Sequence, residues 1–206
     1  MVHVLRQTPG VVVGGLLTTV NAAAGRVAMH AVRESLLRLQ ADALGLPLRI
    51  IPIPSPCPNE VYEAAMRLAV DAVVADGFTH VAFGDLFLAD IRAYRERQLA
   101  GSGLTPLFPL FGADTHALAR QMVDAGLRAR LTCVHPRVLD RRFVSREFDA
   151  ALLDELPDSI DPCGERGEFH SFAYDGPMFS RAIPIVNGDI VECDGFVFAD
   201  LLPGAP

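Results

Sequence analysis

A short polar block in the last quarter of the chain holds the residues best suited to chemistry. Residues 161–170 read DPCGERGEFH, so two glutamates, a cysteine and a histidine surround two glycines. The glycines allow turns that bring Glu165 close to a strand starting near Glu168. On such a strand Glu168 and His170 would share one face, about 7 Å apart along the chain.

Two interpretations of this block are open. The carboxylates of Glu165 and Glu168 could hold a cationic substrate group or, through water, Mg²⁺, while His170 transfers a proton. Alternatively, the block is the solvated edge of a β-hairpin. Cys163 has no evident activating base, so a structural role is favoured over a nucleophilic one. We take Glu165, Glu168 and His170 as the candidate catalytic residues.

A second candidate segment is FGDLFLADIRAYRER at residues 83–97. Gly84 permits a close backbone approach, and Asp85 could bind a metal or a ribose hydroxyl. Arg92 and Arg95 lie three residues apart on one predicted helical face, where they could clamp a phosphate. The alternative is a solvated basic face whose arginines pair with acidic residues of the same helix.

The elements that must position these residues alternate along the first two thirds of the chain. A short helical piece at 2–8 comes first. Apolar runs then predict strands, and apolar residues at helical spacing, including Met29, predict helices that end at glycines. We expect strands at 11–20, 47–54, 79–85, 105–112 and 127–136, and helices at 28–45, 59–77, 88–101 and 113–126. Asn59 is the expected N-cap of the second long helix, and Asp114 or Thr115 that of the fourth. This alternation favours an α/β protein with an open, Rossmann-like parallel sheet over residues 1–138.

The pattern changes near residue 139. A helix at 145–157 is followed by strands at 168–176, 183–195 and 196–202 with tight turns, and Asn187-Gly188 is a strong hairpin signal. Residues 139–206 are therefore expected to form a smaller α+β lobe that packs closely on the sheet.

Ligands of open α/β sheets bind beyond the carboxyl ends of the strands. Thr18, Thr19 and Asn21 follow the first predicted strand, as Gly84 and Asp85 follow the third. His30 is expected in the first turn of a helix, where it could reach a ligand or cap the helix. These residues, with Arg95, are the candidate cofactor-binding residues.

Composition narrows the class of protein. The formal charge is -7 and the pI is about 5.3. Binding to the phosphates of a nucleic acid needs a basic surface, so we expect no nucleic-acid partner. The most apolar stretch, residues 10–20, is too short to span a bilayer, and the N-terminus lacks a secretory pattern, so we expect no membrane partner and place the protein in the cytoplasm. The four cysteines form no C-x-x-C pair, and no pair of histidines has metal-ligand spacing, so no metal site is expected. The sequence leaves open whether the protein forms a homo-oligomer.

Several segments of the sequence together resemble the diphthine-ammonia ligase family of ATP-binding proteins. They are LLTTVN, RVAMHAVR, LGLPL, FGDLFLADIRAYRE, PLFPLFGADT, MVDAGLRARLTCV, REFD and DPCGERGEFHSFAYDGPMF, and they extend over nearly the whole chain. The most specific element reads approximately G-E-G-G-E-Y-E-T in eukaryotic and archaeal relatives. Here it is Gly164 to Ser171, with His170 in place of a glutamate, as we associate with bacterial relatives.

The resemblance implies a fold of the adenine nucleotide α-hydrolase type and ATP-dependent amide formation, in which a carboxylate is activated as an acyl-adenylate and ammonia or another amine displaces AMP. It implies ATP and Mg²⁺ as cofactors and a small-molecule or modified-protein carboxylate as substrate. The family's substrate carries a trimethylammonium group, which the acidic pocket of Glu165 and Glu168 would suit.

One departure concerns the start of the sheet. Relatives begin with a strand and the phosphate-binding loop S-G-G-K-D-S, and the sequence here matches the family only from the helix after that loop. In this fold the first strand lies centrally, so its absence would leave a gap or force its neighbours to pair. The natural protein could be longer, the chain could be a non-catalytic module that binds a small molecule or a partner, or another subunit could supply the strand. ATP binding by this chain is expected to be impaired in each case.

Overall fold

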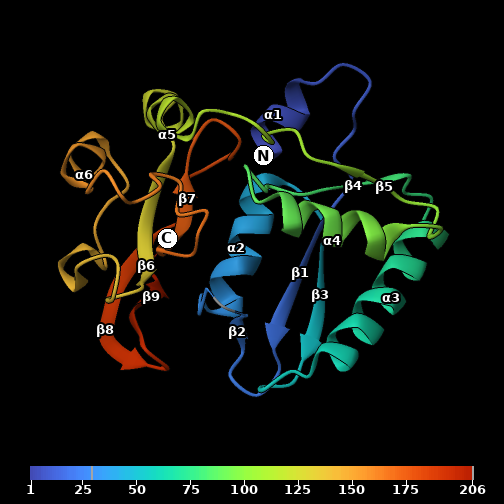
Figure 1. Cartoon of the computed structure of the whole chain (residues 1–206), viewed down its shortest axis with the longest axis horizontal. Coiled ribbons are helices and arrows are strands. Elements are labelled where there is room, and N and C mark those ends of the chain that lie inside the picture. The colour runs from blue at the N-terminus through green and yellow to red at the C-terminus, as the bar shows by residue number, and fades with distance from the viewer. Residues whose placement is uncertain (29, 206) are drawn as a thin grey trace.

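The computed structural model describes residues 1–28 and 30–205 and shows the mixed α/β architecture that the sequence predicts. Parallel strands and helices α2–α4 occupy one side of the molecule in Figure 1, and the antiparallel strands β6–β9 occupy the other. No helix among the described residues is long and apolar enough to cross a membrane. The predicted fold class is confirmed: a Rossmann-like layer carries a smaller lobe.

The first layer contains the predicted alternation of strands and helices. Its elements are α1 (Val2–Gln7), β1 (Leu16–Asn21), β2 (Arg26–Val27), α2 (Glu34–Leu44), β3 (Leu48–Ile53), α3 (Asn59–Ala75), β4 (His80–Ala82), α4 (Ala89–Leu99), β5 (Thr105–Leu107) and α5 (Thr115–Asp124). The strand expected over 11–20 begins only at Leu16, because its parallel partner β3 begins opposite it at Leu48. The prediction for Met29 falls outside the described residues.

The helix expected over 28–45 is wrong in its first part. The chain first forms β2, which pairs antiparallel with the end of β1, and then a turn in which Ala31 has a positive φ of 55°. The backbone amide of Ala28 donates to Thr19, so it is committed to this turn rather than to a helix. His30 therefore lies in the β2–α2 loop and not in a first helical turn.

Helix ends follow the predictions in part. Gly45 ends α2 with a φ of 65°, and Asp114 caps α5 by accepting a hydrogen bond from Ala117 at 2.9 Å. Asn59 does not cap α3: it is the first helical residue, and its side-chain amide donates to Glu63 instead.

The parallel strands form two separate sheets. β1 pairs with β3 over six residues, and β4 pairs with β5 over three, but β1 and β4 are not paired. Figure 1 shows the short pair β4–β5 set apart from β1 and β3. Either a gap or direct pairing of the neighbouring strands was expected from the sequence, and in the described residues β1 and β4 are unpaired with each other.

The lobe is one antiparallel sheet in the order β7-β6-β9-β8. Its strands are β6 (Arg128–Val134), β7 (Phe169–Asp175), β8 (Ile185–Cys193) and β9 (Phe196–Pro203), and η1 (Arg141–Phe143) and α6 (Ala150–Glu155) lie between β6 and β7. β6 was expected in the parallel layer, but it pairs with the strands that follow it. β6 is buried on both faces, and such a strand has the same continuous apolar run in a parallel sheet and in an antiparallel sheet. The boundary at residue 138 stays a prediction.

The hairpin predicted at Asn187-Gly188 is wrong. Those residues lie inside β8, where the pairing with β9 shifts register. The turn is formed instead by Asp194 and Gly195, whose φ values of 51° and 81° are those of a two-residue hairpin.

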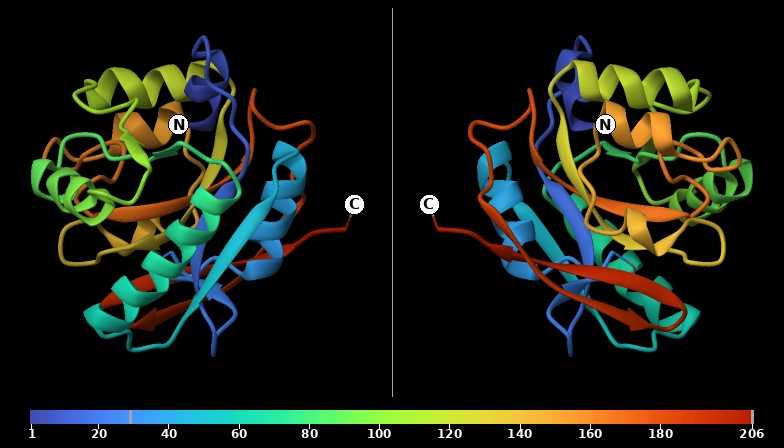
Figure 2. Two further views of the ribbon diagram at one scale, coloured as in Figure 1. Left: turned by 90° about the vertical axis from the view of Figure 1, so that its right-hand side faces the viewer. Right: turned by 90° about the vertical axis from the view of Figure 1, so that its left-hand side faces the viewer.

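Among the described residues three apolar clusters form the core, and one of them packs α3 on β3 within the parallel layer. A second lies within the lobe, between its sheet and helices α5 and α6. The third joins α2 to β7 and β9 through Val32, Leu36, Phe172, Tyr174 and Leu201. In the side views of Figure 2, the last two strands, in red, cross the lower part of the molecule near α2. Helix α2 is therefore the main contact between layer and lobe.

Candidate functional site

A cavity of about 490 Å³ lies where the parallel layer meets the lobe, and we call it the interlobe cavity. The layer contributes Asn21 at the end of β1, Ser55 after β3, and Arg26, Val27, Ala28 and Ala31 between β1 and α2. The lobe contributes His170 and the β8–β9 hairpin, including Phe196. The cavity thus lies at the carboxyl ends of β1 and β3, where open α/β sheets bind ligands.

Two histidines meet beside this cavity. The ring centroids of His30 and His170 are 4.3 Å apart, although the residues are far apart in the sequence. Burial, and then the neighbouring His170, lower the pKa of His30 to about 4. Burial also lowers the pKa of His170. His30 as a residue is exposed, while its ring packs against that of His170, and the lowered pKa of both rings favours their neutral state at pH 7.

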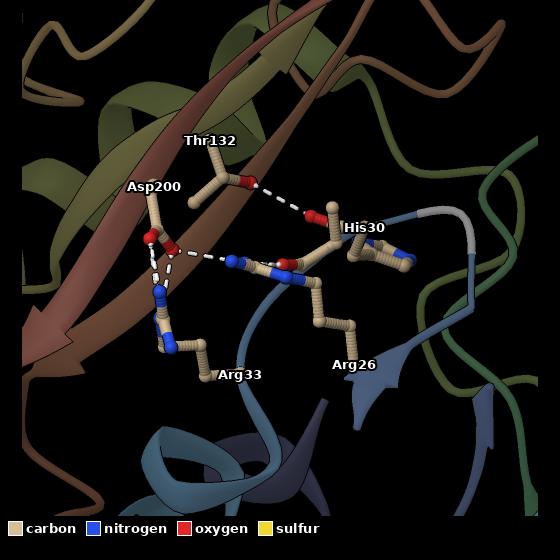
Figure 3. A network of polar contacts seen from close by, with 6 residues as sticks. Arg26, His30, Arg33, Thr132 and Asp200 are labelled. Atoms are coloured by element: carbon tan, nitrogen blue, oxygen red, sulfur yellow. Dashed lines mark hydrogen bonds and ion pairs between the residues drawn. The ribbon is translucent and has the colours of Figure 1, made fainter. Parts of the chain in front are cut away.

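The loop that carries His30 is tied to the lobe by a charged network, shown in Figure 3. Asp200 of β9 accepts hydrogen bonds from Arg26 at 2.9 Å and from Arg33 at 2.5 Å. Arg26 also donates to the backbone oxygen of Ala31 at 2.8 Å. Thr132 of β6 lies 3.4 Å from the backbone oxygen of His30. These contacts fix the β2–α2 loop against the lobe and so position His30.

The charge of Asp200 depends on its arginine partners. Its side chain is only 17% exposed, and burial alone would raise its pKa. The hydrogen bonds from Arg33 and Arg26 outweigh burial and lower the pKa to about 2. Asp200 is therefore a permanent anion at neutral pH.

Sequence reasoning missed this network. It predicted the two strands of the β8–β9 hairpin, but not that the hairpin lines the cavity. Arg26 and Asp200 are 174 positions apart, and no local pattern links them. The hairpin carries Cys193 and Asp194 at the cavity, and its Asp-Gly turn was a usable sequence signal beside the competing Asn-Gly pair.

The predicted acidic residues sit in a compact loop rather than on one strand face. Glu168 is buried, and its two oxygens accept hydrogen bonds from the backbone amides of Asp161 and Arg166, each at 3.0 Å. Glu165 accepts from the backbone amide of Leu86 at 2.8 Å, which ties the loop to the segment after β4. His170 is not part of this arrangement, because its ring packs on His30.

Two neighbours of these glutamates have structural features of their own. Gly164 has a φ of 70°, and an added Cβ would lie 2.7 Å from the backbone oxygen of Phe169. Cys163 packs near the backbone of Thr115, and burial, with the charges of Asp161 and Glu165, raises its pKa to about 12. A thiol in this state is a poor nucleophile, in line with a structural role.

The candidate cofactor-binding residues divide into separate places. Asn21 lines the interlobe cavity, and its side chain accepts from the backbone amides of Ala23 and Ala24. His30 does not line the cavity, but its ring packs on that of His170, which does. Thr18 lines a different cavity next to α1, and the oxygen of Thr19 is bonded within the β2 turn.

The remaining candidates follow β4. Asp85 accepts from Arg95 at 2.7 and 3.2 Å, and the Arg95 guanidinium lies over the Phe83 ring. Gly84 has open space where a side chain would be. Arg92 pairs with Glu96 within its own helix, as the alternative interpretation proposed. In the described part of the chain, no three acidic, cysteine or histidine side chains gather to hold a metal ion.

Fold and cavity together define an α/β protein with a ligand-sized site between a Rossmann-like layer and an antiparallel lobe. Residues 114–198 match the family model described as the diphthamide synthase C-terminal domain. A diphthine-ammonia ligase from Schizosaccharomyces pombe is 32% identical over 95 residues, which cover 44% of this chain. The two matches confirm the resemblance to the diphthine-ammonia ligase family over the part of the chain that they cover. The match spans 16% of the yeast protein's length.

Proposed function

We propose that this protein is an amide-forming ligase of the diphthine-ammonia ligase type, which joins ammonia or a related amine to a carboxylate at the interlobe cavity. One observation carries the proposal: the segment that matches the family, residues 114–198, supplies the wall of the cavity that includes His170, Cys193 and Phe196. The relative's name supplies the reaction class, and the cytoplasm stays the proposed compartment.

The chemistry assigned to the histidines follows from their charge state. Amide formation joins nitrogen to the carboxyl carbon, and the attacking nitrogen must lose a proton. A neutral imidazole can accept that proton, and the lowered pKa of His170 and His30 keeps both rings neutral at pH 7. We assign His170 as the proton acceptor, because it lines the cavity and burial lowers its pKa, and His30 as the neighbouring ring that packs against it.

ATP and Mg²⁺ belong to the proposal through the family resemblance alone. When bound, ATP would supply the activation of the carboxylate. The cations beside the cavity, Arg26 and Arg33, are already paired with Asp200, and Asp85 is paired with Arg95. These residues do not form a phosphate or Mg²⁺ site, so no step through the nucleotide is assigned to them. The proposed roles of Glu165 and Glu168 toward a cationic substrate group stay a prediction.

The test measures AMP formation from ATP in the presence of ammonium and a protein that carries diphthine. Because ATP binding by this chain is expected to be weak, the assay is run at high ATP concentration. We expect AMP only when all components are present, and a fall in kcat of about 10²-fold or more for His170→Ala. Val186→Asp is the matched control, because Val186 is exposed on β8 away from the cavity lining. No AMP, together with no rise in melting temperature on adding ATP and Mg²⁺, would overturn the proposal and favour a non-catalytic binding module.

A further inference from the structure

A second ligand-sized cavity lies between helices α3 and α4, on the side of the molecule away from the lobe in Figure 1. Its volume is about 340 Å³, which is in the range of small-molecule sites. One face of α3, the second half of α4, the turn at 100–102 and the ring of Phe83 line it, and we call it the α3–α4 cavity. It shares no lining residue with the interlobe cavity, so the two are separate places on the protein.

Aromatic and aliphatic side chains form much of the wall of the α3–α4 cavity. Tyr62 comes from α3 and Tyr94 from α4, and both are half-buried. Met66 adds apolar surface from α3. The Phe83 ring is already covered on one face by the guanidinium of Arg95, which lies 4.4 Å from the ring centroid. The two tyrosines are therefore the aromatic surface that remains for a ligand.

Glu63 places a carboxylate in this aromatic wall. Its Oε1 accepts hydrogen bonds from the side-chain amides of Asn59 at 2.9 Å and Gln98 at 3.1 Å. Both donors are neutral, and among the described residues no arginine or histidine forms an ion pair with Glu63. The Tyr94 hydroxyl is a near neighbour, since burial, and then the charge of Glu63, raise its pKa. Glu63 is thus a half-buried anion without a counter-ion.

The other charged groups of the lining do not neutralise Glu63. Arg95 is paired with Asp85 at 2.7 Å. Arg67 and Asp71 are opposite in sign, and both are exposed to solvent, where their charges are screened. The uncompensated charge inside the cavity is therefore the negative charge of Glu63.

We propose that the α3–α4 cavity binds a small organic cation, an amine whose apolar or aromatic body packs against Tyr62 and Tyr94 while its ammonium group pairs with Glu63. An ammonium group is attracted both to the faces of aromatic rings and to a carboxylate. An anion would be repelled by Glu63, and a neutral ligand would leave its charge uncompensated. This site goes beyond the ligase reaction, which is assigned to the interlobe cavity.

The probe is phenethylammonium, which joins an aromatic ring to a primary ammonium group. The control ligands have a similar size and shape: 2-phenylethanol is neutral, and phenylacetate is an anion. Phenethylammonium should bind with a Kd of about 1 mM or below, as suits a ligand of this size. Each control ligand should bind at least about tenfold more weakly, because it cannot pair with the carboxylate.

Binding is followed by NMR through the tyrosine ring signals. The chain has three tyrosines, and Tyr62 and Tyr94 line the cavity, whereas Tyr174 packs in the core near α2. We expect phenethylammonium to shift the signals of Tyr62 and Tyr94 and to leave that of Tyr174 unchanged.

Two variants of α3 test the charge within the same helix. Glu63→Gln keeps an oxygen that can accept from Asn59 and Gln98, so it should fold normally. It should weaken phenethylammonium binding at least about tenfold and leave the binding of 2-phenylethanol unchanged. Glu60→Gln removes the same charge from an exposed position outside the cavity, and it should bind phenethylammonium as the unchanged protein does.

The proposal is overturned if the Kd of phenethylammonium is above about 10 mM, or if either control ligand binds as tightly. These two results need no variant. Equal binding by Glu63→Gln and Glu60→Gln would also overturn it, as would shifts at His170 in place of the tyrosines, which would put the amine in the interlobe cavity. All measurements use the protein without ATP, so they are independent of ligase activity.

Discussion

Replacing Asp200 with asparagine tests the network that joins the His30 loop to the lobe. The change keeps the shape of the side chain but removes the charge that Arg26 and Arg33 share. Both arginines would then stay in place without their anion, in a part of the surface that is only partly solvated.

The structure gives the size of the effect. The arginine hydrogen bonds lower the pKa of Asp200 from 3.8 to about 2, which corresponds to about 2 kcal/mol of stability at neutral pH. Removing one partner of a buried ion pair costs about 3 to 5 kcal/mol, and this site is partly exposed. We therefore expect Asp200→Asn to lower the free energy of unfolding by about 2 to 4 kcal/mol at pH 7.

Urea unfolding at several pH values is the assay. Because the folded-state pKa is depressed, the contribution of Asp200 is complete above the unfolded pKa of 3.8 and is lost as the pH falls through about 2. The two proteins should therefore differ at pH 7 and converge toward pH 2. Asp154→Asn is the control, since the Asp154–Arg120 pair is well exposed and should be worth less than about 1 kcal/mol.

A loss no larger than that of Asp154→Asn would refute the reasoning about Asp200. A difference between Asp200→Asn and the unchanged protein that persists undiminished at pH 2 would also refute it, because the effect would then not come from the charge.

Three further predictions follow from the site. Gly164→Ala should lower stability by about 1 to 3 kcal/mol in urea unfolding, because of its positive φ and the contact with Phe169. NMR titration should show the His30 ring neutral from pH 7 down to near pH 4; its depressed pKa makes stability fall as the pH drops from 6.5 toward 4, a loss that His30→Gln should reduce. Cys133 and Cys163, whose pKa burial raises to about 12, should react with iodoacetamide far more slowly in the native than in the unfolded protein.

Each of these has its own contrary result. Gly101 also has a positive φ, but the space around it is open. Gly101→Ala should therefore lower the free energy of unfolding less than Gly164→Ala does. An equal loss would show that the contact with Phe169 contributes nothing. A His30 ring that titrates near pH 6.5 would contradict the prediction that it stays neutral down to near pH 4. Native-state alkylation of Cys163 as fast as that of the exposed Cys193 would contradict its burial.

Local sequence patterns predicted most elements of the fold because those patterns act over a few residues. Gly45 and Asp114 end and begin their helices as expected, since a positive φ and a side-chain cap are local requirements. The partner of β6 was not predictable in this way, because a strand buried on both faces has the same apolar run in a parallel or an antiparallel sheet. The choice of Asp194-Gly195 over Asn187-Gly188 depended on register with β9, which is a tertiary property.

The candidate site was predicted in fragments. Asn21 and His170 do line one cavity and His30 packs on His170, but the contact between the two histidines needs the lobe to fold over the β2–α2 loop. Glu168 was grouped with His170 by strand spacing, whereas its carboxylate turns back to the amides of its own loop. Spacing gives the face of a side chain only inside a regular strand, and β7 begins one residue after Glu168.

The central claim is amide formation at the interlobe cavity, and ¹⁵N-labelled ammonium tests it most directly. The protein is incubated with ATP, Mg²⁺, labelled ammonium and a diphthine-bearing protein, and the product is analysed by mass spectrometry. The proposal predicts one labelled nitrogen in the product for each AMP released, with both signals lost in His170→Ala and kept in Val186→Asp. Labelled product formed equally well by His170→Ala, or AMP released without labelled product, would contradict it.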